Sequence, residues 1–313
     1  PTNSVGMLDL NSVAIGTSPA YSLEVEHPTG RQFAAHLRDV ADYFELPVQE
    51  GVEVLRVTRY DDGFRVDTPE ETLRAKNVIW AAGEFQVPPT DGLDGLNHCR
   101  HTATIGSYND LEGDEFAVIG GYESGVDAAY HLARRGKKVQ LFDGGNAWDE
   151  QSSDPSISLS TFTRQRTRED VFKQQVTLIP ETFVTSVVDD DGGFEISALD
   201  GRTFRSPTAP LYAGGFAGGH QMVADLFERR PDGFPLLTER DESTITPGLF
   251  LCGPTIRHDN HVFCFIFKFR QRFAVVAKAI ADSLGLAAEE LETYRQWGMY
   301  LDDLSCCGEE CAC

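Results

Sequence analysis

One stretch decides the predicted fold: Phe116-Ala-Val-Ile-Gly-Gly-Tyr-Glu-Ser-Gly125-Val-Asp-Ala-Ala-Tyr-His-Leu-Ala-Arg-Arg-Gly-Lys-Lys-Val-Gln-Leu-Phe-Asp143. Its first four residues form a short apolar run, which is typical of a parallel strand buried on both faces. Apolar residues then recur at helical spacing, and Gly136 stands where a C-terminal cap belongs. The stretch therefore predicts a strand, a glycine turn, a helix and a second strand that ends at Asp143.

The predicted turn consists of Gly120, Gly121, Tyr122, Glu123, Ser124 and Gly125. Such a turn aims backbone N–H groups and the positive end of a helix at one point, where a dinucleotide diphosphate binds. Asp143 follows Gly120 by 23 residues, near the offset of about 20 for a carboxylate that binds the NADH ribose. Tyr122 occupies the middle glycine position of G-x-G-x-x-G. The hypothesis is dinucleotide binding with NADH favoured over NADPH; the alternative is a structural unit with an exposed Asp143.

Composition limits the class of protein. With 313 residues, of which 41% are hydrophobic, the chain can bury a large core and is expected to hold about two domains. A net charge of −22 argues against nucleic acid or an anionic membrane as partner, because both need clustered positive charge. No long apolar run and no signal-peptide pattern occur. A soluble, cytoplasmic protein is expected.

The flanking sequence predicts further elements. Residues 1–28 show no sustained period and predict a connecting loop, whereas residues 31–44 predict an amphipathic helix that packs on a sheet. Short runs between Val52 and Trp80 predict strands of an antiparallel meander. Apolar residues from Phe263 to Ile280 predict one long helix.

The meander recurs later in the chain. Residues 57–66 and 187–196 superpose at an offset of 130. An apolar strand follows each copy, ending in Gly83 after the first and in Gly215 after the second. We interpret this as an internal duplication, with two ordinary hairpins as the alternative. The glycine turn of the first copy would precede Pro1. We therefore interpret the sequence as a fragment; the alternative is that a second polypeptide supplies the missing part. The predicted fold is α/β, with two Rossmann-type, doubly wound, parallel-sheet domains, each with an antiparallel meander, the first incomplete at its N-terminus.

Three motifs stand in the order seen in flavoprotein pyridine-nucleotide oxidoreductases. They are Val78-Ile-Trp-Ala-Ala-Gly83, Val118-Ile-Gly-Gly-Tyr-Glu-Ser-Gly125 and Thr246-Pro-Gly-Leu-Phe-Leu-Cys-Gly253. The chain resembles the thioredoxin-reductase-like and flavin-monooxygenase-like branch of that family. The resemblance implies FAD and NADH or NADPH as cofactors, with FAD near four residues: Ala82, Gly83, Gly253 and Pro254. It also implies an FAD-binding domain over 1–110, an NAD(P)-binding domain over 111–216, a return to the FAD domain over 217–285 and an extension over 286–313.

The sequence departs from the family at two places. Gly253-Pro254 stands where the family has a Gly-Asp pair whose acid binds FAD, so that contact is absent or moved. No Cys-x-x-Cys precedes the NAD glycines, so the chain is not expected to work as a thioredoxin reductase. Two further groups are interpreted without a ligand: His258 and His261 as polar loop residues rather than metal ligands, and Arg164 to Arg168 as a solvated turn rather than a 2′-phosphate site.

Four of the seven cysteines lie in the last eight residues: Cys306, Cys307, Cys311 and Cys313. In a cytoplasmic protein such a cluster points to metal or redox chemistry more than to structural disulfides. The run Leu304-Ser-Cys-Cys307 is similar to the end of mercuric reductases, which implies that Cys306 and Cys307 are a catalytic pair that passes a soft metal toward the flavin. All four cysteines are candidate metal ligands. The flanking acids raise the thiol pKa values, and a disordered appendage is the alternative.

The predicted function follows from these parts together. The protein is expected to pass a hydride from NAD(P)H to FAD, and electrons onward to a disulfide, a thiol-bound metal or another small-molecule or thiol substrate. One alternative is a flavin-dependent monooxygenase. Another is a non-catalytic nucleotide-binding or metal-binding protein. A homodimer is the assembly considered.

Overall fold

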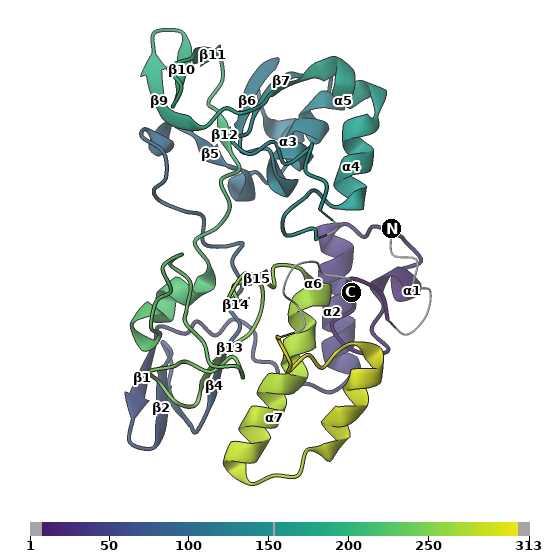
Figure 1. Cartoon of the computed structure of the whole chain (residues 1–313), viewed down its shortest axis with the longest axis vertical. Helices are drawn as coiled ribbons and strands as arrows, with labels where there is room; N and C mark the ends of the chain where they lie inside the picture. The colour runs from purple at the N-terminus through teal and green to yellow at the C-terminus, as the bar shows by residue number, and fades with distance from the viewer. Residues whose placement is uncertain (1–7, 153, 306–313) are drawn as a thin grey trace. The chain divides into compact units, whose positions relative to one another are not determined.

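The computed structural model describes residues 8–152 and 154–305, which divide into two compact units (Figure 1). Unit 1 contains the described residues up to Glu84 and those from Gly219 onward, and unit 2 runs from Phe85 to Gly218. The four tail cysteines lie outside the described residues. Within the described ranges, no helix is both long and apolar enough to cross a membrane.

Unit 2 is built on a parallel sheet with the strand order β5-β12-β6-β7-β8. Its strands are β5 (Arg100–His101), β6 (Glu115–Ile119), β7 (Lys138–Phe142), β8 (Val176–Ile179) and β12 (Leu211–Tyr212). A parallel strand between two layers needs an unbroken apolar run, and every residue of β6 after Glu115 is buried. Because β5 pairs with β12, the segment from Phe85 packs in unit 2, although the sequence assigned residues up to 110 to the first domain.

Helix α3 (Glu123–Ala133) connects β6 to β7, as Figure 1 shows, and it buries most of its residues against them. Gly136 adopts a φ of +74° beyond its end, and the N–H of Lys137 donates to the carbonyl of Leu132 at 3.1 Å, which closes the helix as a C-terminal cap does. The predicted strand, turn, helix and strand are confirmed. The other helices of unit 2 are α4 (Thr161–Arg168), α5 (Asp170–Gln175), η1 (Leu96–His98), η2 (Thr102–Thr104) and η3 (Tyr108–Asp110).

Each unit contains a three-stranded antiparallel meander. The strands are β1 (Arg56–Tyr60), β2 (Gly63–Asp67) and β3 (Thr72–Ala75) in unit 1, and β9 (Val184–Asp190), β10 (Gly193–Ala198) and β11 (Thr203–Ser206) in unit 2. Val57 pairs with Val66, and at an offset of 130 Val187 pairs with Ile196. The identical register supports the predicted duplication of the meander, and the α/β fold class is confirmed.

The rest of unit 1 surrounds a parallel pair in which β4 (Val78–Trp80) lies beside β13 (Leu249–Leu251). Phe64, Leu249 and Ile256 are buried in the core around this pair. The remaining elements are α1 (Pro19–Leu23), α2 (Gly30–Tyr43), β14 (Arg257–His258), β15 (His261–Val262), α6 (Ile266–Phe269), α7 (Phe273–Leu284), η4 (Gly219–Leu226), η5 (Arg270–Arg272) and η6 (Glu289–Trp297).

Three element predictions for unit 1 are wrong. Strand β4 does not belong to the meander, because β3 pairs with β2 and β4 pairs with β13 instead. The predicted loop contains α1, which begins after Ser18 caps its first turn. The predicted long helix is divided into α6, η5 and α7. That division coincides with Arg270 and Arg272, whose buried guanidinium groups donate to Ser12 and Asp241.

Helix α2 forms where the sequence predicts it, but it does not pack on a sheet. Thr29 and Gln32 form a capping box at its N-terminus. Within the helix only His36 is buried, and Leu37 on its apolar face is 37% exposed. Its main contact is with α1, so the predicted sheet packing is wrong over the described residues.

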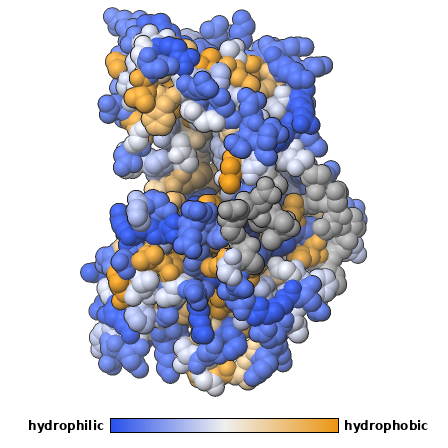
Figure 2. All heavy atoms as spheres, viewed as in Figure 1, coloured by the Kyte–Doolittle hydropathy of each residue, from blue (hydrophilic) through white to orange (hydrophobic). Residues whose placement is uncertain are grey.

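The surface drawn in Figure 2 is mostly hydrophilic, with small apolar patches. The chain has 49 acidic and 27 basic residues. The prediction that neither nucleic acid nor an anionic membrane binds it rests on this excess of negative charge.

Candidate functional site

The glycines of the predicted nucleotide turn have no room for a side chain. A Cβ atom on Gly125 would lie 1.7 Å from the carbonyl oxygen of Gly120, and one on Gly120 would lie 2.5 Å from that of Ala213. A Cβ atom on Gly121 would lie 2.4 Å from the ring of Trp148. Gly120 also has a φ of +104°, which other residues rarely adopt. These glycines let α3 approach β6 closely, as the third glycine of a dinucleotide turn does.

The N-terminus of α3 lies directly behind this turn. No side chain caps the helix there, so its positive end is available to an anion. Ser124 lies in the first turn and is half-buried. Tyr122, at the middle position of the pattern, packs against the core of unit 2, and its hydroxyl donates to the carbonyl of Ser158 at 3.4 Å. The ring is therefore held by protein contacts.

Glu123 is engaged by a neighbouring helix. Its carboxylate accepts hydrogen bonds from the N–H of Ser160 and from the hydroxyl of Thr163, the latter at 2.6 Å. Ser160 is also the N-cap residue of α4. The structure thus places this predicted cofactor residue as a link between the N-termini of α3 and α4.

Asp143 lies at the end of β7, directly beside the glycine turn. Its carboxylate accepts hydrogen bonds from three backbone N–H groups: Gly121 at 3.0 Å, Gly145 at 2.6 Å and Asn146 at 2.9 Å. The side chain is half-buried, so it is not the exposed acid of the structural alternative. The predicted ribose carboxylate and the predicted phosphate turn are therefore brought together, and the negative charge at this position opposes a 2′-phosphate.

The arginines considered for a 2′-phosphate lie in helix α4, so the prediction of a solvated turn is wrong. The Nε–H of Arg164 donates to the carbonyl of Leu159 at 3.0 Å. Arg166 forms an ion pair with Asp127, and its guanidinium lies 4.1 Å from the ring centroid of Phe162. Both groups are held by the protein itself.

The residues expected near FAD meet at one edge of unit 1. Trp80 pairs with Leu251 in the parallel register of β4 and β13, so Ala82 and Gly83 follow one strand where Gly253 and Pro254 follow the other. Gly83 and Gly253 have φ values of +69° and +110°. No atom lies within 4 Å of a Cβ position on Gly253. The backbone beside Gly253 is therefore open to a ligand.

A titratable cluster lies beside this edge. The carbonyl of Gly83 accepts the N–H of Gly219 at 2.6 Å, and the next residue, His220, is 4% exposed with neither ring nitrogen hydrogen-bonded. Burial, reinforced by the nearby Arg229 and Arg257, lowers the pKa of His220. Burial also raises the pKa of Glu84, against an opposing effect of Arg257. A buried imidazole without a partner is unusual, and a polar ligand would satisfy it.

These residues fit FAD in part. The open glycine edge and the unpartnered His220 suit a polar ring system. Over the described part of unit 1, however, neither β4 nor β13 leads through a glycine turn into a helix N-terminus, so no cradle for the diphosphate of FAD is present there. The glycine edge and His220 could hold the flavin end of FAD.

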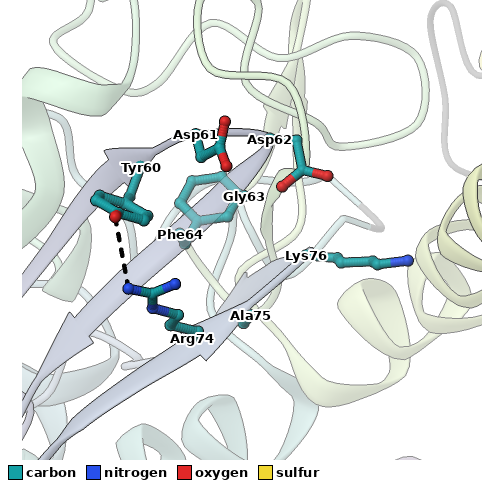
Figure 3. A pocket seen from close by; sticks show the side chains of 8 residues that line it. All are labelled: Tyr60, Asp61, Asp62, Gly63, Phe64, Arg74, Ala75 and Lys76. Carbon is teal, nitrogen blue, oxygen red and sulfur yellow. Dashed lines mark hydrogen bonds between the residues drawn. The ribbon is translucent and has the colours of Figure 1, made fainter.

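A cavity of about 170 Å³ lies at the hairpin end of the first meander, and Figure 3 shows the side chains that line it. Arg74 points to Tyr60 and donates to its hydroxyl at 3.4 Å. The cavity lining contains none of the predicted site residues. A second cavity of unit 1, of about 440 Å³, is lined by Arg257, His258 and Ser305 among others. Among residues 8–152 and 154–305, no group of three or more His, Cys, Asp or Glu is arranged to hold a metal.

The sequence interpretation missed a buried ionic group. Asp241 and Arg272 are both 0% exposed. The Nε and Nη2 groups of Arg272 donate to the carboxylate of Asp241 at 2.9 and 3.0 Å. Nε2 of His258 lies 2.5 Å from the same carboxylate, so the interpretation of His258 as a polar loop residue is wrong. The signal was the charged pair Arg270 and Arg272 within an otherwise apolar helical pattern, because buried charges need partners.

Comparison with known proteins agrees with this geometry. The profile of a family described as pyridine nucleotide-disulphide oxidoreductase matches residues 1–253. One relative, a component of the alkyl hydroperoxide reductase of Staphylococcus epidermidis, is 26% identical over 255 residues, which cover 76% of this chain and 46% of that protein. The chain spans less than half the length of the curated relatives that it matches first.

Two solved structures share the fold. The bacillithiol disulfide reductase of Staphylococcus aureus has a TM-score of 0.68 and 18% identity, and the match covers 90% of this chain and 86% of that one. A flavin-containing monooxygenase from Stenotrophomonas maltophilia has a TM-score of 0.60 and 17% identity, over 82% and 78% of the two chains. At these identities the likeness shows the fold alone.

Proposed function

Because the chain belongs to the pyridine nucleotide-disulphide oxidoreductase family, we propose that it binds NADH at the glycine turn and delivers its hydride, through FAD, to a disulfide or thiol-bound acceptor. One observation carries the proposal. The turn from Gly120 to Gly125 lies between a parallel strand and an uncapped helix N-terminus, with Asp143 beside it. That combination suits a diphosphate and an adjacent ribose.

The chain's own residues have distinct parts in this proposal. Backbone N–H groups at the start of α3 bind the diphosphate, and Asp143 accepts a hydrogen bond from a ribose hydroxyl. Gly83 and Gly253 let the backbone of unit 1 approach the flavin end of FAD. The chemistry that a bound flavin would supply is to accept a hydride and to pass its electrons on. The protein supplies binding, orientation and exclusion of water.

The preference for NADH is supported by charge. Asp143 brings a negative charge to the place where NADPH carries its 2′-phosphate. Of the three arginines considered as phosphate ligands, Arg164, Arg166 and Arg168, the first two are engaged by Leu159 and Asp127. A 2′-phosphate would thus meet a carboxylate without a free counter-charge from these two arginines.

A thiol or disulfide acceptor is supported by two observations. The solved structure with TM-score 0.68 is a disulfide reductase, and this chain ends in the pair Cys306 and Cys307 with Cys311 and Cys313 after it. We propose that Cys306 and Cys307 exchange electrons with the acceptor and that the four cysteines bind a soft metal when one is present. A monooxygenase would instead consume oxygen with its substrate.

The first test compares the two nucleotides. When protein loaded with FAD is mixed with NADH without oxygen, we expect the visible flavin absorbance to be lost faster than with NADPH. Asp143→Asn should reduce this preference roughly tenfold, since it removes a charged hydrogen-bond acceptor. Asp149→Asn, an exposed acid six residues later, is the matched control and should leave the preference unchanged. If neither NADH nor NADPH causes the flavin absorbance to be lost, the proposed reaction is excluded.

The second test addresses the tail. Replacing Cys306 and Cys307 by serine should slow turnover with a disulfide acceptor at least about 100-fold, because a hydroxyl is a far poorer nucleophile at neutral pH. Reduction of the flavin by NADH should not change. Cys99→Ser is the control, since burial raises the pKa of Cys99 to about 11 and keeps its thiol protonated. Unchanged disulfide turnover in the double variant would place the acceptor chemistry elsewhere.

A further inference from the structure

We propose that Phe85 and Phe216 form a platform on which the nicotinamide ring of the dinucleotide stacks, beside the carboxyl end of β12. The inference rests on the proposed function, because it places the far end of a dinucleotide whose diphosphate binds at the glycine turn. It adds two aromatic side chains to that site, and both belong to unit 2.

The strand order of unit 2 sets the direction in which a dinucleotide runs. The order is β5-β12-β6-β7-β8, so the chain proceeds from β6 outward to β7 and β8 and then returns to β12 on the other side of β6. In open α/β sheets, ligands bind outside the carboxyl ends of the strands at such a reversal. Asp143, the proposed ribose ligand, directly follows β7, so the adenosine half lies on that side. The nicotinamide half therefore extends over β12 and β5.

The carboxyl end of β12 is open and lies directly beside the glycine turn. The N–H of Ala213 donates to the carbonyl of Ile119 at 2.7 Å, and a Cβ atom on Gly120 would lie 2.5 Å from the carbonyl oxygen of Ala213. Gly214 and Gly215 follow, and both are exposed. Gly215 has a φ of +83°, and no atom lies within 4 Å of a Cβ position on it. The backbone here is accessible to the carboxamide of a nicotinamide.

An exposed aromatic pair stands next to these glycines. Phe216 follows Gly215, and its ring centroid lies 5.2 Å from that of Phe85, with an angle of 35° between the ring planes. Phe85 is 65% exposed and Phe216 is half-buried. The two segments are joined, because the N–H of Ala217 donates to the carbonyl of Val87 at 2.9 Å. Exposed aromatic surface beside a binding turn is typical of a place where a flat ligand is covered.

The imidazole of His101, at the end of β5, supports Phe216. Its Nε2 lies 2.9 Å from the carbonyl oxygen of Gly215, and its Nδ1 accepts the N–H of Ala103 at 3.2 Å. A carbonyl only accepts hydrogen bonds, so Nε2 is assigned the hydrogen, and the ring is held at both nitrogens. It forms T-shaped contacts with Phe216 at 5.2 Å and with Tyr212 at 6.0 Å, an arrangement that aromatic rings prefer.

The chemistry of nicotinamide suits this platform. The ring is flat enough to stack on phenylalanine in NADH, and in NAD⁺ it is also a cation, which the negative face of an aromatic ring attracts. Two strand spacings, about 10 Å, separate β7 from β12. The diphosphate and the two riboses of an extended dinucleotide can span that separation from Asp143.

The experiment compares NAD⁺ with ADP-ribose, which has the same adenosine, diphosphate and second ribose but no nicotinamide ring. Neither ligand reduces a flavin, so titration calorimetry on the full chain measures binding alone. We expect Phe216→Ala to weaken the binding of NAD⁺ about three- to tenfold and to leave that of ADP-ribose unchanged. Phe216→Tyr keeps an aromatic face and should retain the affinity of the parent for both.

A second variant and a matched control separate binding from folding. Phe85→Ala should have the same selective effect on NAD⁺, and because this ring is largely exposed, its loss should leave the thermal midpoint close to that of the parent. Tyr43 and Phe44 form another exposed aromatic pair, in unit 1, with ring centroids 5.0 Å apart. Tyr43 is 82% exposed, and Tyr43→Ala should change neither affinity.

The remaining outcomes each contradict the assignment. Unchanged NAD⁺ affinity in both folded alanine variants, or an equal loss for NAD⁺ and ADP-ribose, overturns the platform. A parent that binds ADP-ribose as tightly as NAD⁺ overturns it too, because the nicotinamide ring would then contribute nothing. If the parent binds neither ligand, the proposed function fails and this inference with it. The ADP-ribose titration thus distinguishes a failed platform from a failed nucleotide site.

Discussion

Replacing Arg272 by methionine is expected to lower the free energy of unfolding by about 3 to 5 kcal/mol. Both Arg272 and its partner Asp241 are 0% exposed, so the variant leaves a carboxylate buried with His258 alone. The guanidinium also donates to the carbonyls of Glu239 and Leu301, and these acceptors lose their donor as well. Urea unfolding followed by circular dichroism measures the change through the midpoint and its slope.

The control for this prediction is an exposed pair of the same chemistry. Arg240 lies 3.6 Å from Asp282, and their side chains are 61% and 38% exposed. Arg240→Met should therefore change stability by no more than about 1 kcal/mol. A second comparison replaces both buried partners, Arg272→Met with Asp241→Leu, and should recover part of the loss because no unpaired charge remains. If Arg272→Met and Arg240→Met lowered the free energy of unfolding by the same small amount, the buried pair would not be needed for stability.

Gly125→Ala is expected to weaken NADH binding at least about tenfold and to destabilise unit 2 by about 1 to 3 kcal/mol. The added Cβ would lie 1.7 Å from the carbonyl oxygen of Gly120 and 2.8 Å from its carbonyl carbon. Both are backbone atoms of the turn, so α3 must move away from β6, and the N–H groups at its start move with it. Titration calorimetry with NADH, at a temperature where the variant is folded, measures the loss of affinity.

Gly106→Ala is the matched control in the same unit. No atom lies within 4 Å of a Cβ on Gly106, and its φ is not positive. Affinity for NADH and the thermal midpoint should both stay close to those of the parent. Full NADH affinity in Gly125→Ala would mean that the close approach of α3 to the turn is not what forms the binding site.

Local patterns in the sequence were sufficient to predict the strands, turn and helix at the centre of unit 2. The apolar run before Gly120, the helical spacing after it and the cap at Gly136 each predicted an element that the structure contains. The repeat at an offset of 130 predicted two meanders whose registers agree. In each case neighbouring residues contain the information, because turns, caps and alternation act over a few residues.

Contacts between distant segments were beyond the same reasoning. Strand β4 was predicted as part of the first meander, but it pairs in parallel with β13. The apolar face of α2 was predicted to pack on a sheet, but it does not. Asp143 accepts hydrogen bonds from the nearby Gly145 and Asn146, but its bond from Gly121, 22 residues away, exists only because β7 lies beside β6. The sequence predicted that Glu123 binds a cofactor, whereas in the fold its carboxylate accepts hydrogen bonds from Ser160 and Thr163.

The sequence by itself determined the strand, glycine turn and helix that suit a dinucleotide, the two similar meanders, and the pair Cys306 and Cys307. Only the tertiary structure decided that Arg272, Asp241 and His258 form one buried group, and that His258 and Ser305 share a cavity. The physical reason is the range of the interactions. Backbone conformation is set by near neighbours, whereas a buried charge is tolerated only where the whole fold brings its partner within hydrogen-bonding distance.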